Sequence, residues 1–275
     1  MTPWRSGTIA VSGGHLAYHR TGGDGPALVL SHGLTDNGLC WSRFAAAMEA
    51  DFDIVMLDAR GHGNSSRIPR DIPYDPARDL GEAIDGLGLT SPVLMGHSVG
   101  AYATAQCAGA RPGQIAKVVL EDPPFLPAAE PSAIEARRRR FRRQVEAYQP
   151  MSEAQITATG KASSPGWHDD EFHAWAAAKR QVDPEAMPSY AAPWRRAIER
   201  ITAQTLLLFG DADRGGLVTA AVATEAAEIN GNIRTVGIGG AGHNIRRENF
   251  ADFLTVVSAF LLEPSAGWSP RRPNP

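Results

Sequence analysis

The stretch VLMGHSVGAY, residues 93–102, decides the fold of this chain. It contains a Gly-x-Ser-x-Gly pentad, Gly96 to Gly100, which follows a short apolar run and precedes a helical pattern. A serine on a tight strand-to-helix turn has a strained backbone and exposes its hydroxyl, so the residues two positions away must be small. The pentad makes Ser98 a candidate nucleophile, and a glycine-rich turn without chemistry is the alternative.

Short apolar runs alternate with longer helical patterns on both sides of the pentad. This alternation predicts an α/β fold with a mostly parallel sheet and helices on both of its faces. A Ser-Gly-Gly turn predicts an antiparallel hairpin of residues 8–11 and 16–19 ahead of that sheet. The expected strands are 27–30, 54–57, 93–95, 118–120, 205–209 and 233–238, and the expected helices are 41–50, 76–86, 102–110, 216–229 and 246–262.

Residues 123–202 interrupt this rhythm, because they hold helical patterns punctuated by prolines and no strand-like run. We interpret them as a helical insertion in an α/β core formed by residues 1–122 and 203–263. The proline-rich segment 264–275 is expected to be a disordered tail.

Composition excludes several classes of function. The 275 residues are 43% apolar, which is enough for one large core, and the net charge of −3 gives no reason to expect nucleic acid or an acidic membrane as a partner. Two cysteines, Cys40 and Cys107, cannot form a disulfide framework. No signal peptide or membrane-spanning run is evident. We therefore expect a cytoplasmic monomer or homodimer that acts on a small molecule.

A serine hydroxyl needs a base, and the base needs an acid that orients it. His243, on a glycine-rich loop between the last expected strand and helix, is the candidate base. Three carboxylates at the ends of expected strands compete for the role of the acid: Asp122, Asp211 and Asp213, of which Asp213 is preferred. Histidines and carboxylates also cluster at 168–173, but they are ordinary on an exposed helix. We expect no metal and no organic cofactor.

An oxyanion needs backbone N–H donors beside the nucleophile. The segment SHGL, residues 31–34, follows an expected strand, so the N–H groups of Leu34 and Val99 are the predicted oxyanion hole. His32 is interpreted as a side chain that shapes the loop.

Four motifs in this order resemble the α/β-hydrolase family over nearly the whole chain. They are the His32-Gly33 turn, DARGHGNS at 58–65, GHSVG at 96–100, and GDAD at 210–213 followed by Gly-His at 242–243. The resemblance implies the chain order Ser98, Asp213, His243, with the acid three residues after Gly210. A serine nucleophile argues against haloalkane dehalogenases and epoxide hydrolases, and the HGLTDNG loop looks more like esterases, lactonases and cofactor-free haloperoxidases than C–C bond hydrolases.

In this family such an insertion is a cap over the active site. Its aromatic residues would then line an apolar substrate pocket, and the candidates are Phe125, Phe141, Trp167 and Trp194. The alternative is that these rings pack the cap onto the core. The run RRRRFRR, residues 137–143, is either a solvated helix surface or an anion-recognising lid, as in a lyase resembling the menaquinone-pathway member of this fold.

The expected function is hydrolysis of an ester or lactone of a small, largely apolar molecule through an acyl-enzyme on Ser98, with an acidic substrate as a variant. One alternative is a C–C bond hydrolase or lyase that uses the same three residues on an anionic substrate. The other is a non-catalytic receptor for a small ligand.

Overall fold

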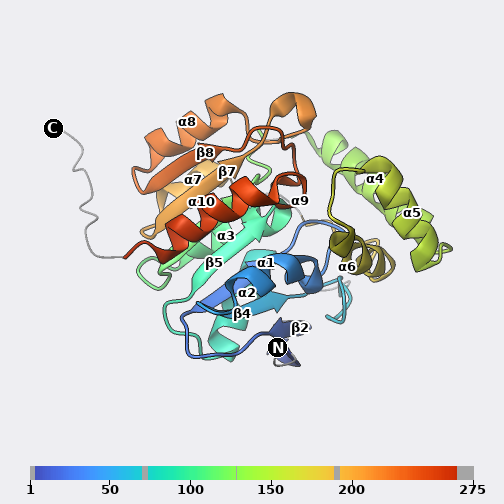
Figure 1. The fold of residues 1–275 in the computed structure, drawn as a ribbon, viewed down its shortest axis with the longest axis horizontal. Coiled ribbons are helices and arrows are strands. Elements are labelled where there is room, and N and C mark those ends of the chain that lie inside the picture. The colour runs from blue at the N-terminus through green and yellow to red at the C-terminus, as the bar shows by residue number, and fades with distance from the viewer. Residues whose placement is uncertain (1–3, 70–73, 128, 189–192, 265–275) are drawn as a thin grey trace.

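A computed structural model describes residues 4–69, 74–127, 129–188 and 193–264 (Figure 1). Its centre is an eight-stranded sheet in the order β1-β2-β4-β3-β5-β6-β7-β8. β1 and β2 form the expected hairpin, β2 pairs antiparallel with β4, and all other pairs are parallel. The strands are β1 Arg5–Val11, β2 Gly14–Arg20, β3 Ala27–Ser31, β4 Asp53–Leu57, β5 Val93–His97, β6 Lys117–Glu121, β7 Gln204–Phe209 and β8 Ile233–Gly237.

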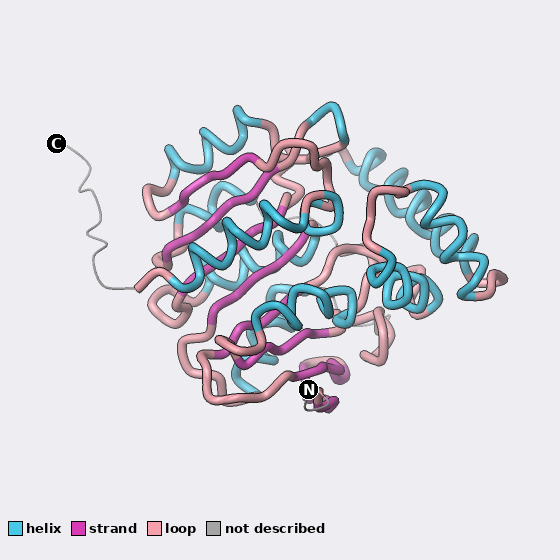
Figure 2. Tube along the Cα trace, viewed as in Figure 1, coloured by secondary structure: helices cyan, strands magenta, loops and turns pink. Residues whose placement is uncertain are grey.

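Helices cover both faces of the sheet (Figure 2). The core helices include α1 Ser42–Met48, α2 Pro76–Gly86, α3 Val99–Ala110, α7 Trp194–Glu199, α8 Ala220–Ile229, α9 Ile245–Glu248 and α10 Phe250–Leu262. Successive residues of a strand point to opposite faces, so Ile54 and Met56 of β4 pack with α1 and α10, while Val55 and Leu57 pack with α2 and α3. Both faces are apolar, and β4, β5 and β6 are buried along their whole length.

Three helices lie together beyond the edge of the sheet to which the parallel strands point (Figure 1). They are α4 Pro131–Tyr148, α5 Glu153–Ser163 and α6 Asp169–Arg180, and we call them the cap. Ile156, Phe172 and Trp175 form a small apolar core between α5 and α6. The fourth helix of the predicted insertion, α7, packs against α3 and α8 of the core.

α3 begins at Val99, ahead of the predicted start at residue 102, and two other expected helices differ more from the observed ones. The helix predicted at 216–229 begins only at Ala220, because Thr219 caps it and the two preceding amides donate to Asp122. The last helix is divided at Asn249, whose side chain caps α10. The predicted tail, apart from Pro264, lies outside the described residues. Within the described ranges, no helix has both the length and the apolar character needed to cross a membrane.

Candidate active site

Ser98 occupies a strained turn between β5 and α3. Its backbone has φ 55° and ψ −123°, a region that residues with a side chain rarely adopt. A Cβ atom on Gly96 would lie 2.5 Å from the backbone of Gly100, and one on Gly100 would lie 2.3 Å from the Ser31 carbonyl oxygen. Both glycines are therefore required by space, as expected of a tight strand-to-helix turn, and the role of Ser98 as a nucleophile stays a prediction.

His243 is placed as the sequence predicted. Its Nε2 lies 3.0 Å from the Ser98 Oγ. Its Nδ1 lies 2.6 Å from a carboxylate oxygen of Asp122, and because a carboxylate only accepts, Nδ1 carries the proton. Nε2 is thus left free to accept the hydroxyl proton of Ser98, which is the arrangement that general-base catalysis requires.

The predicted pairing of Asp213 with His243 is wrong, because the carboxylate that reaches the histidine belongs to Asp122. Asp122 follows β6 directly and is fully buried. Its carboxylate also accepts hydrogen bonds from the backbone N–H groups of Leu217 and Val218, at 2.9–3.1 Å. These donors fix the carboxylate in the orientation that holds the imidazole.

The path of the His243 loop explains why Asp213 does not reach the imidazole of His243. The loop passes directly over the end of β7, so closely that a Cβ on Gly210 would lie 2.2 Å from the Gly242 carbonyl oxygen. Asp213, in a short 3-10 turn beyond Gly210, is exposed. Asp211 instead accepts from the backbone N–H of Gly240 at 2.7 Å, so it ties two loops together.

A cavity between the core and the cap contains Ser98 and His243. Leu34 and Val99 line it too, as expected of residues whose N–H groups would bind an oxyanion, and that role stays a prediction. His32 lies behind them and shapes the loops, since its Nε2 accepts from the Ala59 N–H at 2.9 Å and its Nδ1 bonds the Gly33 carbonyl at 2.8 Å. This confirms its interpretation as a structural residue.

Of the four aromatic residues predicted to contact substrate, Trp167 lines this cavity. The prediction is wrong in placement for the other three. Phe125 and Trp194 stack on each other with ring centroids 4.6 Å apart and are buried in the core. Phe141 is buried with Val145 of the same helix. These rings pack because each faces a neighbouring apolar layer rather than the space above Ser98.

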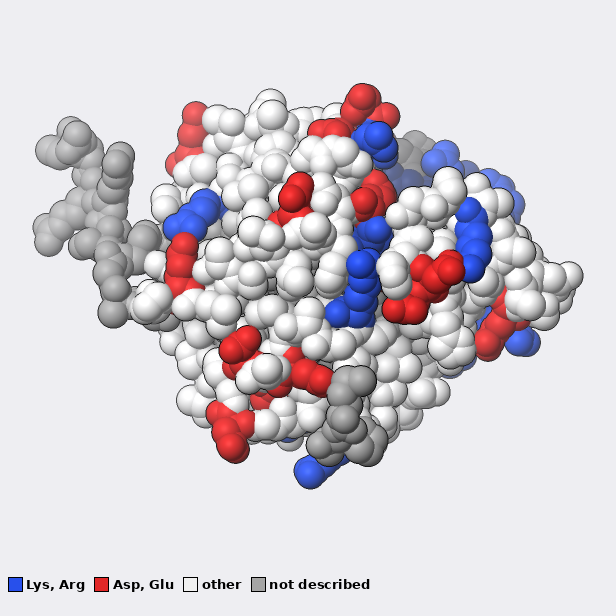
Figure 3. All heavy atoms as spheres, viewed as in Figure 1, with Lys and Arg blue, Asp and Glu red and all other residues white. Residues whose placement is uncertain are grey.

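The arginine run 137–143 lies on α4, and Figure 3 shows basic side chains over the outer side of α4 and α5. Arg142 pairs with Glu185 and Arg139 with Glu135, both pairs partly or largely in solvent. Among the described residues that line the Ser98 cavity, α4 contributes Gln144 and Tyr148 rather than an arginine. The run thus corresponds to the solvated helix surface.

The sequence reasoning missed six buried charged residues next to the cavity. We call them the inner charge cluster: Asp36, Glu121, Glu171, Lys179, Arg246 and Arg247. Burial raises the pKa of Asp36, but the nearby Arg247, Lys179 and Arg246 outweigh it and hold that pKa well below its usual range. Burial also raises the pKa of Glu121, against the opposing charge of Arg246.

The inner charge cluster joins the active site to the cap. Glu121 directly precedes Asp122 in the chain. The Glu121 carbonyl accepts the N–H of Ser98 at 2.9 Å, and the Glu121 carboxylate accepts the backbone N–H of Arg246 at 2.8 Å. Arg246 also donates to Asp36 at 3.2 Å. Lys179 of α6 reaches the same Asp36 at 3.2 Å, so a continuous chain of charges runs from the nucleophile turn to the cap.

His97 lies next to His243, the candidate base. Its Nε2 lies 2.9 Å from the carbonyl oxygen of His243, to which it donates, and the two rings are 4.8 Å apart. Burial, and then the charges of Arg246 and His243, hold the pKa of His97 well below its ordinary value. The His97 ring is therefore neutral beside His243.

Comparison with known proteins identifies the family to which this fold belongs. The alpha/beta hydrolase family model matches residues 28–255. The chain is 28% identical to the N-formylmaleamate deformylase of Pseudomonas putida, over 94% of this chain and 97% of that protein. It is 24% identical to the 2-(acetamidomethylene)succinate hydrolase of Mesorhizobium japonicum, over 88% and 90%. A crystal structure of E-2-(acetamidomethylene)succinate hydrolase superimposes with a TM-score of 0.79 at 22% identity, covering 94% of this chain and 99% of that one.

The chain belongs to the alpha/beta hydrolase family, a family of hydrolytic enzymes. The fold expected from its motifs is confirmed, including the antiparallel first hairpin and the mostly parallel sheet. Structural neighbours include an enol-lactonase and an esterase, so the family alone leaves the scissile bond open.

Proposed function

We propose that the protein hydrolyses an ester or amide bond of a small molecule through an acyl-enzyme on Ser98. The observation that carries this proposal is the hydrogen-bonded chain from the Ser98 Oγ through His243 to Asp122, with distances of 3.0 Å and 2.6 Å, at the wall of a cavity. Asp122 fixes the tautomer, His243 takes the proton from Ser98, and the hydroxyl oxygen attacks the acyl carbon.

The backbone N–H groups of Leu34 and Val99 bind the oxyanion that develops in this step. His243 then gives its proton to the leaving group, and a water molecule, activated by the same histidine, hydrolyses the acyl-enzyme. Each donor of this kind is worth about 3–4 kcal/mol of barrier lowering in related chemistry. The proposal needs no metal or organic cofactor.

Amides with a carboxylate elsewhere in the molecule are the second candidate substrates, beside the esters and lactones expected from the sequence. Two relatives that align along nearly their whole length carry names of such compounds, an N-formyl maleamate and an acetamido-substituted succinate. The cavity supports this candidate, because Lys179, Arg247 and Asn244 are among its lining residues. The two cations are paired with carboxylates, so they would attract an anion through their field more than through free donors.

The nucleophile is tested with Ser98→Ala. We expect loss of labelling by a fluorophosphonate probe, detected by intact mass, and a fall in kcat for p-nitrophenyl acetate of at least about 10³-fold. Ser6→Ala is the matched control, because Ser6 also bonds a histidine, with Oγ 2.9 Å from the Nδ1 of His19, but on the exposed surface. Full labelling of the Ser98→Ala protein would refute the proposal.

The scissile bond is tested separately, by comparing initial rates on an ester, a lactone and an N-acyl amide, each with and without a carboxylate in the leaving group. Faster turnover of the carboxylate-bearing amide would select the second candidate. Faster turnover of the neutral ester or lactone would select the first.

A further inference from the structure

The loop that carries His243 has little stiffness of its own. Three of the five residues in its segment GGAGH, residues 239–243, are glycines, and glycine has more backbone freedom than any other residue. Asp211 ties this loop to the end of β7 by accepting the N–H of Gly240 at 2.7 Å. The candidate nucleophile and the acid follow β5 and β6 instead, so the geometry of the site depends on what holds the loop to those two strands.

Glu121, the last residue of β6, makes hydrogen bonds to both sides of the site. Its backbone carbonyl accepts the N–H of Ser98 at 2.9 Å. Its carboxylate reaches the other side, where one oxygen accepts the backbone N–H of Arg246 at 2.8 Å and the second accepts from the guanidinium of the same residue at 3.2 Å. Arg246 lies three residues after His243, so the carboxylate holds the main chain that follows the base.

These contacts close a ring of bonds around the site. The ring runs from the Ser98 Oγ to the His243 Nε2, along the chain to Arg246, across to the Glu121 carboxylate, and through the Glu121 carbonyl back to the Ser98 N–H. Within this ring, the Glu121 carboxylate is the side-chain link that takes no part in proton transfer. A shift of this link changes the separation of Ser98 and His243.

Stability alone is a weak reason to bury a carboxylate in this place. Glu121 is fully buried, and burial raises its pKa against the opposing charge of Arg246. Replacement of a buried ion pair by apolar side chains of similar volume is often neutral or stabilising. The bond from the carboxylate to a backbone N–H is different in kind, because it fixes the main chain beside the base rather than a mobile side chain.

His97 provides a second link between the same loop and the nucleophile turn. Its Nε2 donates to the backbone carbonyl of His243 at 2.9 Å, from the residue that directly precedes Ser98. This bond holds one end of the segment 243–246, and the Glu121 carboxylate holds the other end. One hydrogen bond fixes a position but leaves rotation about it, so the second link adds the orientation of the imidazole.

We infer that Glu121 is a positioning residue of the reaction, which sets the separation and orientation of Ser98 and His243 by accepting the backbone N–H of Arg246. The inference rests on the proposed function, because it assumes that His243 activates Ser98. Glu121 is not among the described residues that line the Ser98 cavity. Its loss should therefore lower kcat and leave KM almost unchanged, and a misplacement of about 1 Å can lower a rate by about 10²-fold.

The test compares two double variants that both remove the ion pair. Glu121→Gln with Arg246→Met keeps an oxygen at position 121 that can accept the backbone N–H at position 246, whereas Glu121→Met with Arg246→Met has no such acceptor. We expect kcat for p-nitrophenyl acetate to be at least about 30-fold lower in the second double variant than in the first, with KM values within about threefold. The rate constant for fluorophosphonate labelling should fall in parallel, because labelling needs the same activated Ser98.

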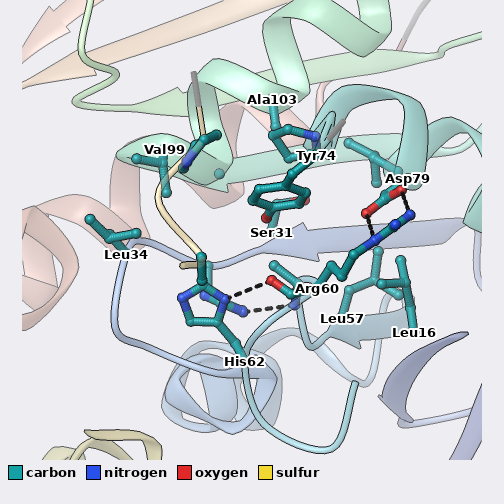
Figure 4. Close-up of a pocket in the computed structure, with 17 residues that line it drawn as sticks. Leu16, Ser31, Leu34, Leu57, Arg60, His62, Tyr74, Asp79, Val99 and Ala103 are labelled. Atoms are coloured by element: carbon teal, nitrogen blue, oxygen red, sulfur yellow. Dashed lines mark hydrogen bonds and ion pairs between the residues drawn. The ribbon is translucent and has the colours of Figure 1, made fainter. Parts of the chain in front are cut away.

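The pair of Arg60 and Asp79 offers a matched control, because it is also a buried arginine–carboxylate pair. Figure 4 shows the two side chains bonded to each other on the opposite side of a pocket from Val99. The Asp79 carboxylate accepts from the Arg60 guanidinium, with 2.9 Å to its Nε, rather than from the main chain beside His243. Asp79→Asn with Arg60→Met and Asp79→Leu with Arg60→Met should therefore differ by less than about threefold in kcat.

Two single variants keep the inference testable if a double variant fails to give the wild-type circular dichroism spectrum. Glu121→Asp keeps the charge but withdraws the carboxylate by one methylene from the Arg246 N–H, so kcat should fall by about tenfold or more. Glu121→Gln keeps the length of the side chain and an acceptor oxygen, so it should lose less activity than Glu121→Asp.

Two results would overturn the inference while leaving the proposed function intact. One is an equal kcat in the two folded double variants, in an enzyme that Ser98→Ala inactivates. The other is a smaller loss from Glu121→Asp than from Glu121→Gln, because charge rather than contact with the main chain would then decide activity. Activity that survives Ser98→Ala would instead count against the proposed function itself.

Discussion

Positive charge is concentrated in two regions of the molecule, one exposed to solvent and the other buried. The arginine run on α4 lies on the outer side of the cap, where its ion pairs are largely in solvent (Figure 3). The inner charge cluster has fewer cations, spread along the chain, but Lys179, Arg246 and Arg247 are nearly inaccessible to water. An exposed ion pair contributes about 0–1 kcal/mol, whereas breaking a buried one costs several times more.

Among the described residues, the inner charge cluster rather than the arginine run contributes charged side chains to the Ser98 cavity. The inner charge cluster touches the loop of His243 through Arg246 and the cap through Lys179, and Asp36 joins the two. These charged residues contact one another across the fold, although they lie far apart in the sequence. The following two changes test the contrast, starting with the larger expected effect.

Asp36→Asn should destabilise the fold by about 3–5 kcal/mol at pH 7, because it leaves three buried cations with one carboxylate fewer. The folded pKa of Asp36 lies well below its unfolded value of 3.8, so its contribution is present above that pH and is lost as the pH falls through the folded pKa. The free energy of unfolding in urea should therefore differ between the wild type and the variant by the full amount at pH 7, and this difference should decrease below about pH 4.

Asp51→Asn on the surface is the control, and it should shift stability little at either pH. If the loss of stability caused by Asp36→Asn did not change with pH, the loss would not be electrostatic in origin. It would instead indicate that the amide disturbs packing.

The double variant Arg140→Ala, Arg143→Ala should do almost nothing, because both side chains are exposed on α4. We expect a change within about 0.5 kcal/mol in stability and within about twofold in kcat/KM. The measurement uses a substrate with a carboxylate in the leaving group, against a neutral analogue. A selective loss of more than about tenfold on the charged substrate would restore the arginine run as an anion-recognising lid.

Local chemistry made the core of the site predictable from the sequence. The pentad around Ser98 needs a tight turn, and Gly96 and Gly100 have no room for a side chain. His243 stands on a glycine-rich loop between a strand and a helix, so both its type and its place indicated a base. The alternation of short and long patterns predicted the sheet, because strand and helix periodicities differ.

The acid and the cap contacts could not be predicted in the same way. Asp122 and Asp213 both follow strands, and only the path of the His243 loop over β7 decides between them. Asp122 was one of the three candidates, but its place at the end of an expected strand was shared by Asp211 and Asp213 and did not single it out. No local sequence pattern distinguishes Lys179, because its contacts are with Thr35 and Asp36, more than a hundred residues away in the chain.

The most direct test of the account compares Asp122→Asn with Asp213→Asn. We expect Asp122→Asn to lower kcat by about 10³–10⁴-fold, since an amide in this place would favour the wrong tautomer of His243. Asp213→Asn should remain within about twofold of the wild type, because its side chain is exposed on a turn outside the site. A greater loss of kcat from Asp213→Asn than from Asp122→Asn would contradict the geometry on which the proposed function rests.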